Sequence, residues 1–454
     1  MRTLFGTDGI RGKAHVYPLD PATMFAMGQA LAHRLVEEAR RSGSASSTDA
    51  TPAILLGMDT RESGPEIAGA LTAGIEHGGG RAIFIGVVPT PAVAYLCRTS
   101  DATAGISISA SHNPFGDNGV KVFGHDGMKI PDASEEQIED EMRAIRREDS
   151  VVPDIELHPD DALIERYEQF LAGGVAPGAL RGRKIVLDTA NGAAFRIGPE
   201  AFRRAGAEIL VIHDQPDGSN INENAGALHP ERLSEVVLAE KADFGVAFDG
   251  DADRAIFVDD AGKVRDGDEI IYLWAQRLHR LGKLKNDLVV TTVMSNFGFE
   301  RQLRQDGIEL CRANVGDKYV LEMMIERGAL LGGEQSGHII DLDVHTTGDG
   351  IHTALVFGEL LAGADQPFSK LPTFQPMPQL LLNENVVSKP PLETLPKYQE
   401  ALSQAQSELH GDGRILVRYS GTENKVRVMV EGPDAEQIKS IAERLKDALR
   451  DEIR

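Results

Sequence analysis

The sequence predicts an α/β fold made of three successive, similar α/β domains with mixed sheets, followed by a smaller C-terminal α+β domain. The chain has 454 residues and is 41% hydrophobic, which is enough for several packed domains. Short apolar runs alternate with amphipathic segments, as is typical of parallel strands joined by helices. This rhythm occurs three times and then changes in the last part of the chain.

Each α/β round contains buried strands with helices between them. The first round predicts strands at 53–58, 82–87 and 103–108, and helices at 21–40 and 65–77. The second predicts strands at 184–187, 208–212 and 243–248, and helices at 198–205 and 230–241. The third predicts strands at 287–292, 308–313 and 329–333, and helices at 316–327 and 348–361.

The last part has a different pattern. It predicts strands at 380–387, 414–419 and 425–431, and helices at 395–409 and 434–453. The resulting domains are 1–161, 162–264, 265–376 and 377–454. Residues 41–52, rich in Ser, Thr and Ala, predict a surface loop. The charged segment 132–161 predicts a solvated helix with a linker, and 363–377, with three prolines, predicts the connection into the last domain.

Net charge and cysteine content exclude several classes of protein. The 47 Lys and Arg against 70 Asp and Glu give a net charge of −23, which disfavours nucleic acid and anionic membranes as partners. Basic groups for an anionic substrate would then have to gather locally. Cys97 and Cys311 are too few and too far apart for a disulfide framework, and no apolar stretch is long enough to cross a bilayer. We therefore expect a cytoplasmic protein.

Ser111 is the strongest candidate for a reactive side chain. It lies in a polar Ser-His-Asn-Pro turn after an apolar run, between Gly105 and Gly116. A turn signal at 117–119 would carry Lys121 back toward the loop, where it could counter phosphate charge or, with a depressed pKa, move a proton. An ordinary loop is the alternative, but the flanking residues favour a serine that carries a phosphoryl group.

Asp249, Asp251 and Asp253 predict a metal site. Carboxylates at alternate positions of a loop can converge on one hard cation, with Mg²⁺ favoured over Mn²⁺. An EF-hand is disfavoured, because Arg254 stands where that loop needs glycine and Asp260 where it needs glutamate. A solvated turn is disfavoured because three adjacent anions would repel one another.

Four further segments carry weaker signals. GGEQSGH (332–338) offers Glu, Ser and His to hydroxyls or an amine, or is a turn with one satisfied histidine. Residues 418–427 suit an oxyanion cradle within a hairpin connection. Arg11, in a glycine-rich turn at 6–12, could reach a shared cleft, whereas 57–64 could be a helix cap and nothing more.

In this order, these motifs resemble the α-D-phosphohexomutase superfamily over the whole chain. The matching pieces are GTDGIRG (6–12), PTPAVAYL (89–96), ISASHNPFGDNGVKVF (108–123), DGDADR (249–254), VGDKYV (315–320), GGEQSGH (332–338) and RYSGTENKVRVMVEG (418–432). The resemblance implies four domains around a central cleft, each contributing one loop. It also implies phosphoserine at Ser111 and one Mg²⁺ per chain, held by that phosphate and the three aspartates.

The resemblance also implies individual roles. Ser111 would carry the phosphoryl group, Arg11 and Lys121 would serve proton transfer and charge stabilisation, and His112 and Arg254 would flank the phosphoserine. The implied substrate-binding residues are Arg254, Lys318, Glu334, Ser336, His338, Arg418, Ser420, Gly421, Thr422 and Arg427.

Within the superfamily, the Gln of GGEQSGH favours an amino-sugar substrate. The expected reaction interconverts glucosamine 6-phosphate and glucosamine 1-phosphate through a sugar 1,6-bisphosphate, which would also serve as activator. Departures at Lys318, Tyr419, Asn424 and 225–227 remove no charge or ligand, although they bear on sugar preference. The alternatives are mannose or glucose phosphates as substrates, a Mg²⁺-dependent sugar phosphatase, and a non-catalytic sensor. Both monomer and homodimer stay open.

Overall fold

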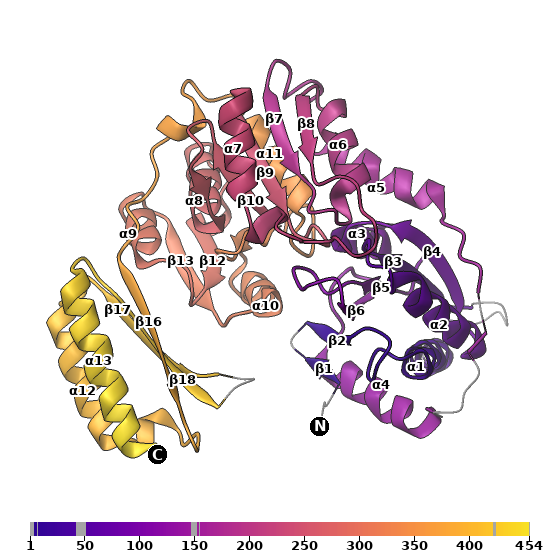
Figure 1. The fold of residues 1–454 in the computed structure, drawn as a ribbon, viewed down its shortest axis with the longest axis horizontal. Coiled ribbons are helices and arrows are strands. Elements are labelled where there is room, and N and C mark those ends of the chain that lie inside the picture. Colours follow the sequence, from indigo (N-terminus) through magenta and orange to yellow (C-terminus); the bar gives the residue numbers. More distant parts are fainter. Residues whose placement is uncertain are drawn as a thin grey trace. The chain divides into compact units, whose positions relative to one another are not determined.

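The computed structural model describes residues 4–6, 8–41, 51–146, 152–153, 155–420 and 424–453 (Figure 1). The chain divides into two compact units. The first comprises Met1–Thr292 with Ala313–Pro372, and the second comprises Val293–Arg312 with Thr373–Arg454.

The first sheet of the first unit has the strand order β1-β2-β6-β5-β3-β4. Its strands are β1 (Phe5–Gly6), β2 (Gly9–Lys13), β3 (Ala53–Met58), β4 (Arg81–Val87), β5 (Ala104–Ile108) and β6 (Asp117–Gly124). Strand β3 pairs in parallel with β4 and β5, whereas β6 is antiparallel to β5 and β2. The sheet is therefore mixed, and an antiparallel hairpin, β5–β6, follows its parallel strands.

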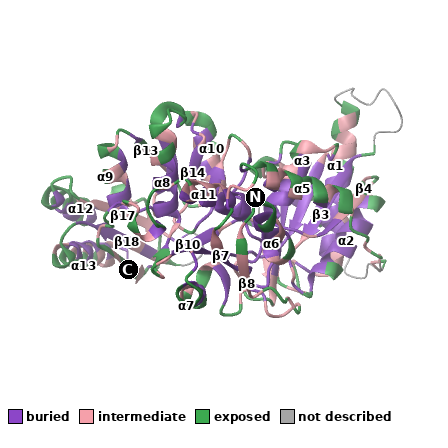
Figure 2. Cartoon of the chain, turned by 90° about the horizontal axis from the view of Figure 1, so that it is seen from above, coloured by how far each residue is buried: buried purple, intermediate pink, exposed green. Residues whose placement is uncertain are grey.

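Helices cover both faces of this sheet, because successive side chains along each strand point to opposite faces. On one face, Ile54 and Ile106 pack in a core with α1 (Pro21–Arg41), α2 (Gly64–His77) and α4 (Asp132–Ile145). Helix α3 (Thr90–Thr99) covers the other face, where a Cβ at Gly105 would lie 2.7 Å from Val93 Cγ1. The absence of a side chain at Gly105 thus lets α3 approach the sheet. Figure 2 shows β3, at the centre of these contacts, as buried.

The second sheet repeats this plan with the order β11-β10-β9-β7-β8. Its elements are α5 (Asp161–Gly173), β7 (Lys184–Asp188), α6 (Ala194–Arg204), β8 (Glu208–Ile212), α7 (Glu231–Glu240), β9 (Phe244–Phe248), β10 (Ala255–Asp259) and β11 (Val264–Arg265). Strand β7 pairs in parallel with β8 and β9, and β10 is antiparallel to β9. Leu233 and Val237 of α7 pack in one core with Val186 and Ala247 of the sheet.

The third sheet of the first unit is smaller. Strand β12 (Leu288–Thr292) is parallel to β14 (Leu331–Gly333), and β14 forms an antiparallel hairpin with β15 (Ile339–Asp341). Its helices are α8 (Gly267–Arg280), α10 (Asp317–Arg327) and α11 (Gly350–Ala362). Short 3-10 helices occur at η1 (Gly226–Leu228), η2 (Lys285–Asp287), η3 (Phe368–Lys370) and, in the second unit, η4 (Leu392–Thr394).

The second unit contains an antiparallel sheet with the order β16-β18-β17. Besides these three strands, β16 (Gln379–Asn385), β17 (Arg414–Tyr419) and β18 (Lys425–Glu431), the unit contains α9 (Phe297–Gln305), β13 (Glu309–Ala313, of which Ala313 is counted with the first unit), α12 (Pro396–Leu409) and α13 (Ala435–Glu452). Val426, Val428 and Val430 alternate along β18 and pack in one core with Ala405 of α12 and Leu445 of α13.

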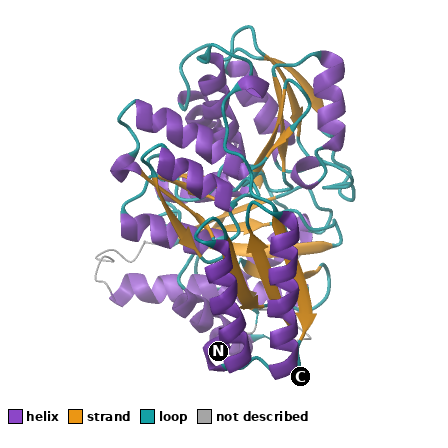
Figure 3. Ribbon diagram, turned by 90° about the vertical axis from the view of Figure 1, so that its left-hand side faces the viewer, coloured by secondary structure: helices purple, strands orange, loops and turns teal. Residues whose placement is uncertain are grey.

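The polar motifs occupy the same feature in each sheet, namely the connection of an antiparallel hairpin. Ser111 lies between β5 and β6, Asp249 between β9 and β10, and Glu334 between β14 and β15. Ser420 follows β17 in the β17–β18 hairpin of the second unit. Figure 3 distinguishes these strands and loops from the helices.

The structure confirms the predicted fold class. The principal misses are helices α3, α5, α8 and α9. Helix α8 does carry an apolar stripe, at Ile270, Ile271, Trp274 and Leu278, which could have indicated this helix from the sequence. Much of the predicted 41–52 loop lies outside the described residues. Within the described chain, no helix combines the length and apolar character needed to cross a membrane.

Candidate active site

Ser111 and Asp249 meet although they belong to different sheets. Ser111 Oγ donates to Asp249 Oδ2 at 2.6 Å, and the Ser111 main-chain N–H donates to Ser109 Oγ at 2.9 Å. Gly250 lets the two hairpins approach, because a Cβ there would lie 2.5 Å from the Ser111 carbonyl oxygen. The fold thus brings a candidate nucleophile onto the predicted carboxylate cluster.

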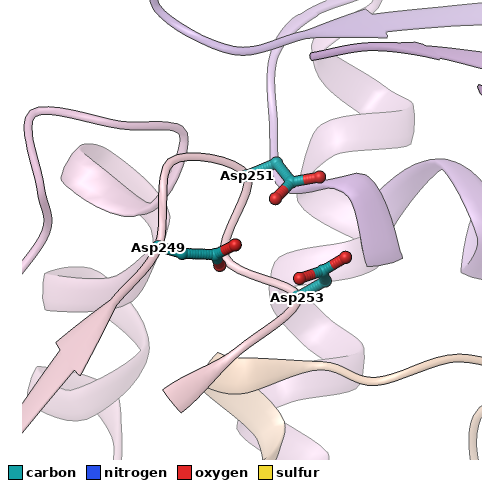
Figure 4. A group of neighbouring side chains, drawn as sticks. All are labelled: Asp249, Asp251 and Asp253. Carbon is teal, nitrogen blue, oxygen red and sulfur yellow. The ribbon is translucent and has the colours of Figure 1, made fainter. Parts of the chain in front are cut away.

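The carboxylates of Asp249, Asp251 and Asp253 extend into one space (Figure 4). One oxygen from each lies within 4.8 Å of the others, and all three residues are buried. Asp251 Oδ2 accepts hydrogen bonds from Lys121 Nζ at 2.9 Å and Thr90 Oγ1 at 2.7 Å. Because the cluster lies in a β-hairpin connection, it is not part of the helix–loop–helix of an EF-hand.

The cluster fits a hard divalent cation. Burial raises the pKa of Asp249 well above its usual value, and the neighbouring Asp253 and Asp251 raise it further. Burial also acts to raise the pKa of Asp253, but Lys121 is foremost among the groups that outweigh it and hold this pKa well below normal. Asp251 Oδ1 and Asp253 Oδ1 are buried without a hydrogen-bond donor among the described residues. A cation bound by these oxygens would relieve both the repulsion and the desolvation.

Lys121 is held in its charged form. It lies directly opposite Ser107 in the β5–β6 pair, and its Nζ is 3.4 Å from Asp253 Oδ2 and 3.3 Å from Asp8 Oδ2. Burial lowers the pKa of Lys121, but Asp251, Asp8 and Asp253 outweigh burial and raise this pKa well above normal. This environment supports a charge-stabilising role for Lys121 and does not depress its pKa.

Asp8 is a site residue that the sequence reasoning missed. Its carboxylate pairs with Arg11, Lys121 and Lys129, and Lys129 Nζ also donates to Asp317 Oδ2 at 2.6 Å. Burial raises the pKa of Asp8, yet Lys121, Lys129 and Arg11 lower it to well below normal. Asp8 and Asp317 fall within the quoted motifs at 6–12 and 315–320, which could have indicated them. Lys129 falls outside every motif.

Arg11, His112 and Arg254 lie around Ser111. Arg11 Nη1 donates to the Ala110 carbonyl at 3.3 Å, next to Ser111. His112 Nδ1 lies 3.2 Å from Ser111 Oγ and 3.3 Å from Arg254 Nη1. Burial lowers the pKa of His112, and Arg254 and Arg11 lower it further. The charge here therefore resides on the arginines, with the imidazole neutral at neutral pH.

A cavity of about 400 Å³ opens beside these residues. Its lining includes Asp8, Arg11, Asp253, Arg254, Asp317, Glu334 and His338. Glu334 Oε1 accepts the Gly316 N–H at 3.2 Å, and His338 Nε2 accepts the Gly348 N–H at 3.0 Å. Ser336 is exposed in the same loop. The cavity therefore presents both carboxylates and cations, as a charged, hydroxyl-rich ligand would require.

The other predicted binding residues are Lys318, in the first unit, and a group in the second unit. Lys318 pairs with Asp132 and lines a different cavity, of about 480 Å³.

Arg418 and Arg427 belong to the second unit, where they lie directly opposite each other on β17 and β18. Burial lowers the pKa of Arg418, and Arg427 lowers it further, so an anion placed between them would be favoured. Ser420 is buried beside them, whereas Gly421 and Thr422 lie outside the described residues.

The fold and the site together define a phosphohexomutase. Residues 2–149, 165–262 and 266–376 match alpha/beta/alpha domains I, II and III of phosphoglucomutase/phosphomannomutase, and 381–448 match its C-terminal domain. The chain belongs to the phosphoglucomutase/phosphomannomutase family, in the α-D-phosphohexomutase superfamily, and it is an isomerase.

Its similarity to curated proteins is more specific. It is 45% identical over 453 residues to a phosphoglucosamine mutase of Solibacter usitatus, covering 100% of this chain and 99% of that protein. It is 44% identical to a phosphoglucosamine mutase of Syntrophobacter fumaroxidans, covering 99% of each.

Solved structures share the fold at lower identity. A phosphoglucomutase/phosphomannomutase family protein of Burkholderia thailandensis has a TM-score of 0.78 and 22% identity, covering 99% of this chain and 98% of that one. An Aspergillus fumigatus N-acetylphosphoglucosamine mutase, solved with GlcNAc-6P and magnesium, has a TM-score of 0.66 and 17% identity, covering 95% and 97%.

Proposed function

We propose that this chain interconverts glucosamine 6-phosphate and glucosamine 1-phosphate through a phosphoserine at Ser111 and a 1,6-bisphosphate intermediate. The observation that carries the proposal is the 2.6 Å contact between Ser111 Oγ and Asp249, within the buried aspartate cluster. The full-length relatives named phosphoglucosamine mutase support the amino-sugar substrate.

Asp249, Asp251, Asp253 and the phosphorylated Ser111 would hold one Mg²⁺ per chain. When bound, this ion supplies positive charge that offsets the phosphoryl oxygens. Asp251 Oδ1 and Asp253 Oδ1, which accept no hydrogen bond from the described part of the chain, support this assignment. The sugar 1,6-bisphosphate serves as intermediate and as activator, because it can phosphorylate a free Ser111.

The chain's own residues position and neutralise the phosphoryl group. In the first half-reaction, the bond between phosphorus and Ser111 Oγ breaks and a bond to the sugar hydroxyl oxygen forms. The hydroxyl proton ends on Ser111 Oγ, which then donates to Asp249 as in the structure. Arg11, Lys121 and Arg254 stabilise the transferring charge, and His112 flanks it. The second half-reaction returns the other phosphoryl group to Ser111.

The remaining site residues bind the sugar phosphate. Glu334, Ser336 and His338 contact the sugar, and Lys318 approaches it from the second cavity, which shares Asp317 with the first. Arg418, Ser420, Gly421, Thr422 and Arg427 hold the distal phosphate, and the facing pair Arg418 and Arg427 supports this role. The partner is then a phosphorylated hexosamine, with neither nucleic acid nor membrane required. The cytoplasm, and a monomer or homodimer, are the expected setting.

A substrate comparison tests the function. Purified protein with Mg²⁺ and a trace of bisphosphate is given the 6-phosphates of glucosamine, glucose and mannose in turn. We expect glucosamine 6-phosphate to have the highest kcat/KM, with sugar 1-phosphate as product and little free phosphate. A poorest rank for glucosamine 6-phosphate contradicts the sugar assignment, and release of free phosphate indicates a phosphatase.

The phosphoserine has its own test. Intact-protein mass spectrometry should show one added phosphate on the wild type that is missing in Ser111→Ala. The variant should lose turnover by at least about 1,000-fold with its unfolding midpoint little changed, because the covalent carrier is gone. Full activity of Ser111→Ala would point to a sensor or to another carrier.

A further inference from the structure

The segment Asp59–Ser63, between β3 and α2, has a role beyond starting a helix. Ser63 occupies the N-cap position of α2, but its side chain makes no capping hydrogen bond within the described chain. Ser63 Oγ instead accepts from Asn118 Nδ2 at 2.9 Å, at the start of β6. A role as helix cap, which the sequence suggested for residues 57–64, therefore does not explain why this segment carries polar side chains.

Arg61 uses every guanidinium N–H on the loop that contains Ser111 and on its own anchor. The side chain is completely buried, and its Nε donates to Asp59 Oδ2 at 2.9 Å. The other four N–H groups reach the main-chain carbonyls of Ser111 at 3.0 Å, Asn113 at 2.8 Å, Asp117 at 2.9 Å and Pro114. These partners match the five donors that an arginine offers in one plane.

A second side chain, from the connection between β8 and η1, holds the same loop. Asn222 Nδ2 donates to the Ser111 carbonyl at 2.9 Å and to the Asn113 carbonyl at 3.2 Å. Both carbonyls therefore accept from Arg61 and from Asn222. The Glu62 N–H donates to the Gly218 carbonyl at 3.0 Å, which ties the Asp59–Ser63 segment to the stretch of chain that presents Asn222.

The loop needs such support because Ser111 is held in an unfavourable main-chain conformation. Its φ of 51° lies in the left-handed region, which costs a non-glycine residue free energy and persists only where surrounding contacts impose it. Asp59, the anchor of Arg61, also accepts from Ser109 Oγ at 2.5 Å, and Ser109 Oγ accepts the Ser111 N–H. The same small network thus reaches both the N–H and the carbonyl of Ser111.

We propose that Arg61, assisted by Asn222, is a positioning residue for phosphoryl transfer: it fixes the main chain of the Ser111 loop so that Oγ stays directed at the aspartate cluster. This inference rests on the proposed phosphoserine function. Neither side chain lines the cavity beside Ser111, so both act through the loop. Removing them should therefore slow transfer more than it weakens sugar-phosphate binding.

The test compares Arg61→Lys and Asn222→Ala with the wild type. Lysine keeps the charge beside Asp59 but has three donors without the planar fork, so it cannot satisfy the same five acceptors. We expect kcat to fall about 30-fold or more in Arg61→Lys and about fivefold in Asn222→Ala, with KM within about threefold of wild type in both, since small misplacements of a reacting group are costly. Phosphoryl transfer from prephosphorylated protein to substrate, in a single turnover, should slow by the same factors.

Arg183→Lys is the matched control, because Arg183 likewise binds one carboxylate, Asp243, and one main-chain carbonyl, that of Ala362. It should leave kcat unchanged. If Arg61→Lys fails to fold, Asn222→Ala and Asn222→Asp decide the matter, with the carboxylate of Asn222→Asp facing two carbonyl oxygens and expected to be the slower. Folded variants with wild-type kcat, or with a lower unfolding midpoint alone, overturn the inference. A wild type that takes up no phosphate on Ser111 from the sugar 1,6-bisphosphate overturns the proposed function instead.

Discussion

Buried polar residues in this chain differ in whether the fold keeps them charged or neutral. Lys121 is surrounded by carboxylates and stays an ammonium ion. His345 is buried beside His352 and Arg98, and burial, followed by these two groups, lowers its pKa to about 3. Its Nε2 lies 3.1 Å from the Pro91 carbonyl and its Nδ1 accepts the Thr347 N–H, an arrangement that needs a neutral ring.

His345 should therefore make stability depend on pH. Unfolded histidine titrates near pH 6.5, so between about pH 6.5 and 3 the unfolded chain binds a proton that the native chain does not. The contribution of the neutral His345 ring to the free energy of unfolding is fully present above pH 6.5 and declines as the pH falls. Its slope is at most about 1.4 kcal/mol per pH unit.

His345→Gln should reduce that slope by about one proton. The measurement is the free energy of unfolding from urea titrations at several pH values between 4.5 and 6.5. His158→Gln is the control, because His158 is solvent-exposed in the native protein. Equal slopes for wild type and His345→Gln would show that the native ring takes up the proton.

At the scale of elements, the active site depends on how closely two hairpins approach. The β5–β6 and β9–β10 connections meet at Gly250, where a Cβ would also lie 2.9 Å from Asn222 Nδ2. Gly337 plays a similar part for the β14–β15 connection, since it has φ of 92° and a Cβ there would lie 2.4 Å from the Ala255 carbonyl oxygen. Small residues at these contacts allow polar loops from different sheets to share one site.

Gly250→Ala should separate Ser111 from the aspartate cluster. The added methyl group must displace the Ser111 carbonyl, and a shift of about 1 Å at a reacting group can cost about 100-fold in rate. We expect kcat to fall by about this factor and more Mg²⁺ to be needed for half-maximal activity. Gly69→Ala is the control, because a Cβ there contacts nothing within 4 Å. Unchanged Mg²⁺ dependence in Gly250→Ala would argue against direct contact between the two hairpins.

At the scale of the whole molecule, the net charge of −23 contrasts with the site. Arg11, Lys121, Lys129 and Arg254 gather around buried carboxylates. The sequence predicted such local gathering from the acidic total. The structure adds that each cation is paired, so the site is a network of both signs and contains no isolated basic patch among the described residues.

Mg²⁺ should stabilise the folded chain through this network. A ligand that binds only the native state stabilises it by about 2.7 kcal/mol at one hundred times its Kd, which is several degrees in unfolding midpoint for a domain of this size. Asp251→Asn should abolish most of the Mg²⁺-dependent shift, whereas Asp214→Asn, at an exposed position, should keep it. Scanning calorimetry with EDTA and with Mg²⁺ measures both. A full shift in Asp251→Asn would place the ion elsewhere.

The sequence by itself determined the fold class, most strands and the position of each polar loop. These depend on the alternation of apolar and amphipathic segments and on turn-forming residues, which are local properties of the chain. It also indicated Ser111 and the three aspartates, since a reactive hydroxyl and alternate carboxylates are recognisable from residue type and spacing. The domain boundaries and the roles of the site residues stay predictions.

Only the tertiary structure decided which groups meet. Asp8, Lys129 and Arg61 gain significance from partners up to 188 positions away in sequence, as in the contact between Lys129 and Asp317. The same holds for the charge of Lys121 and the neutrality of His345. Burial and long-range pairing set these properties, and neither is encoded in any short stretch of residues.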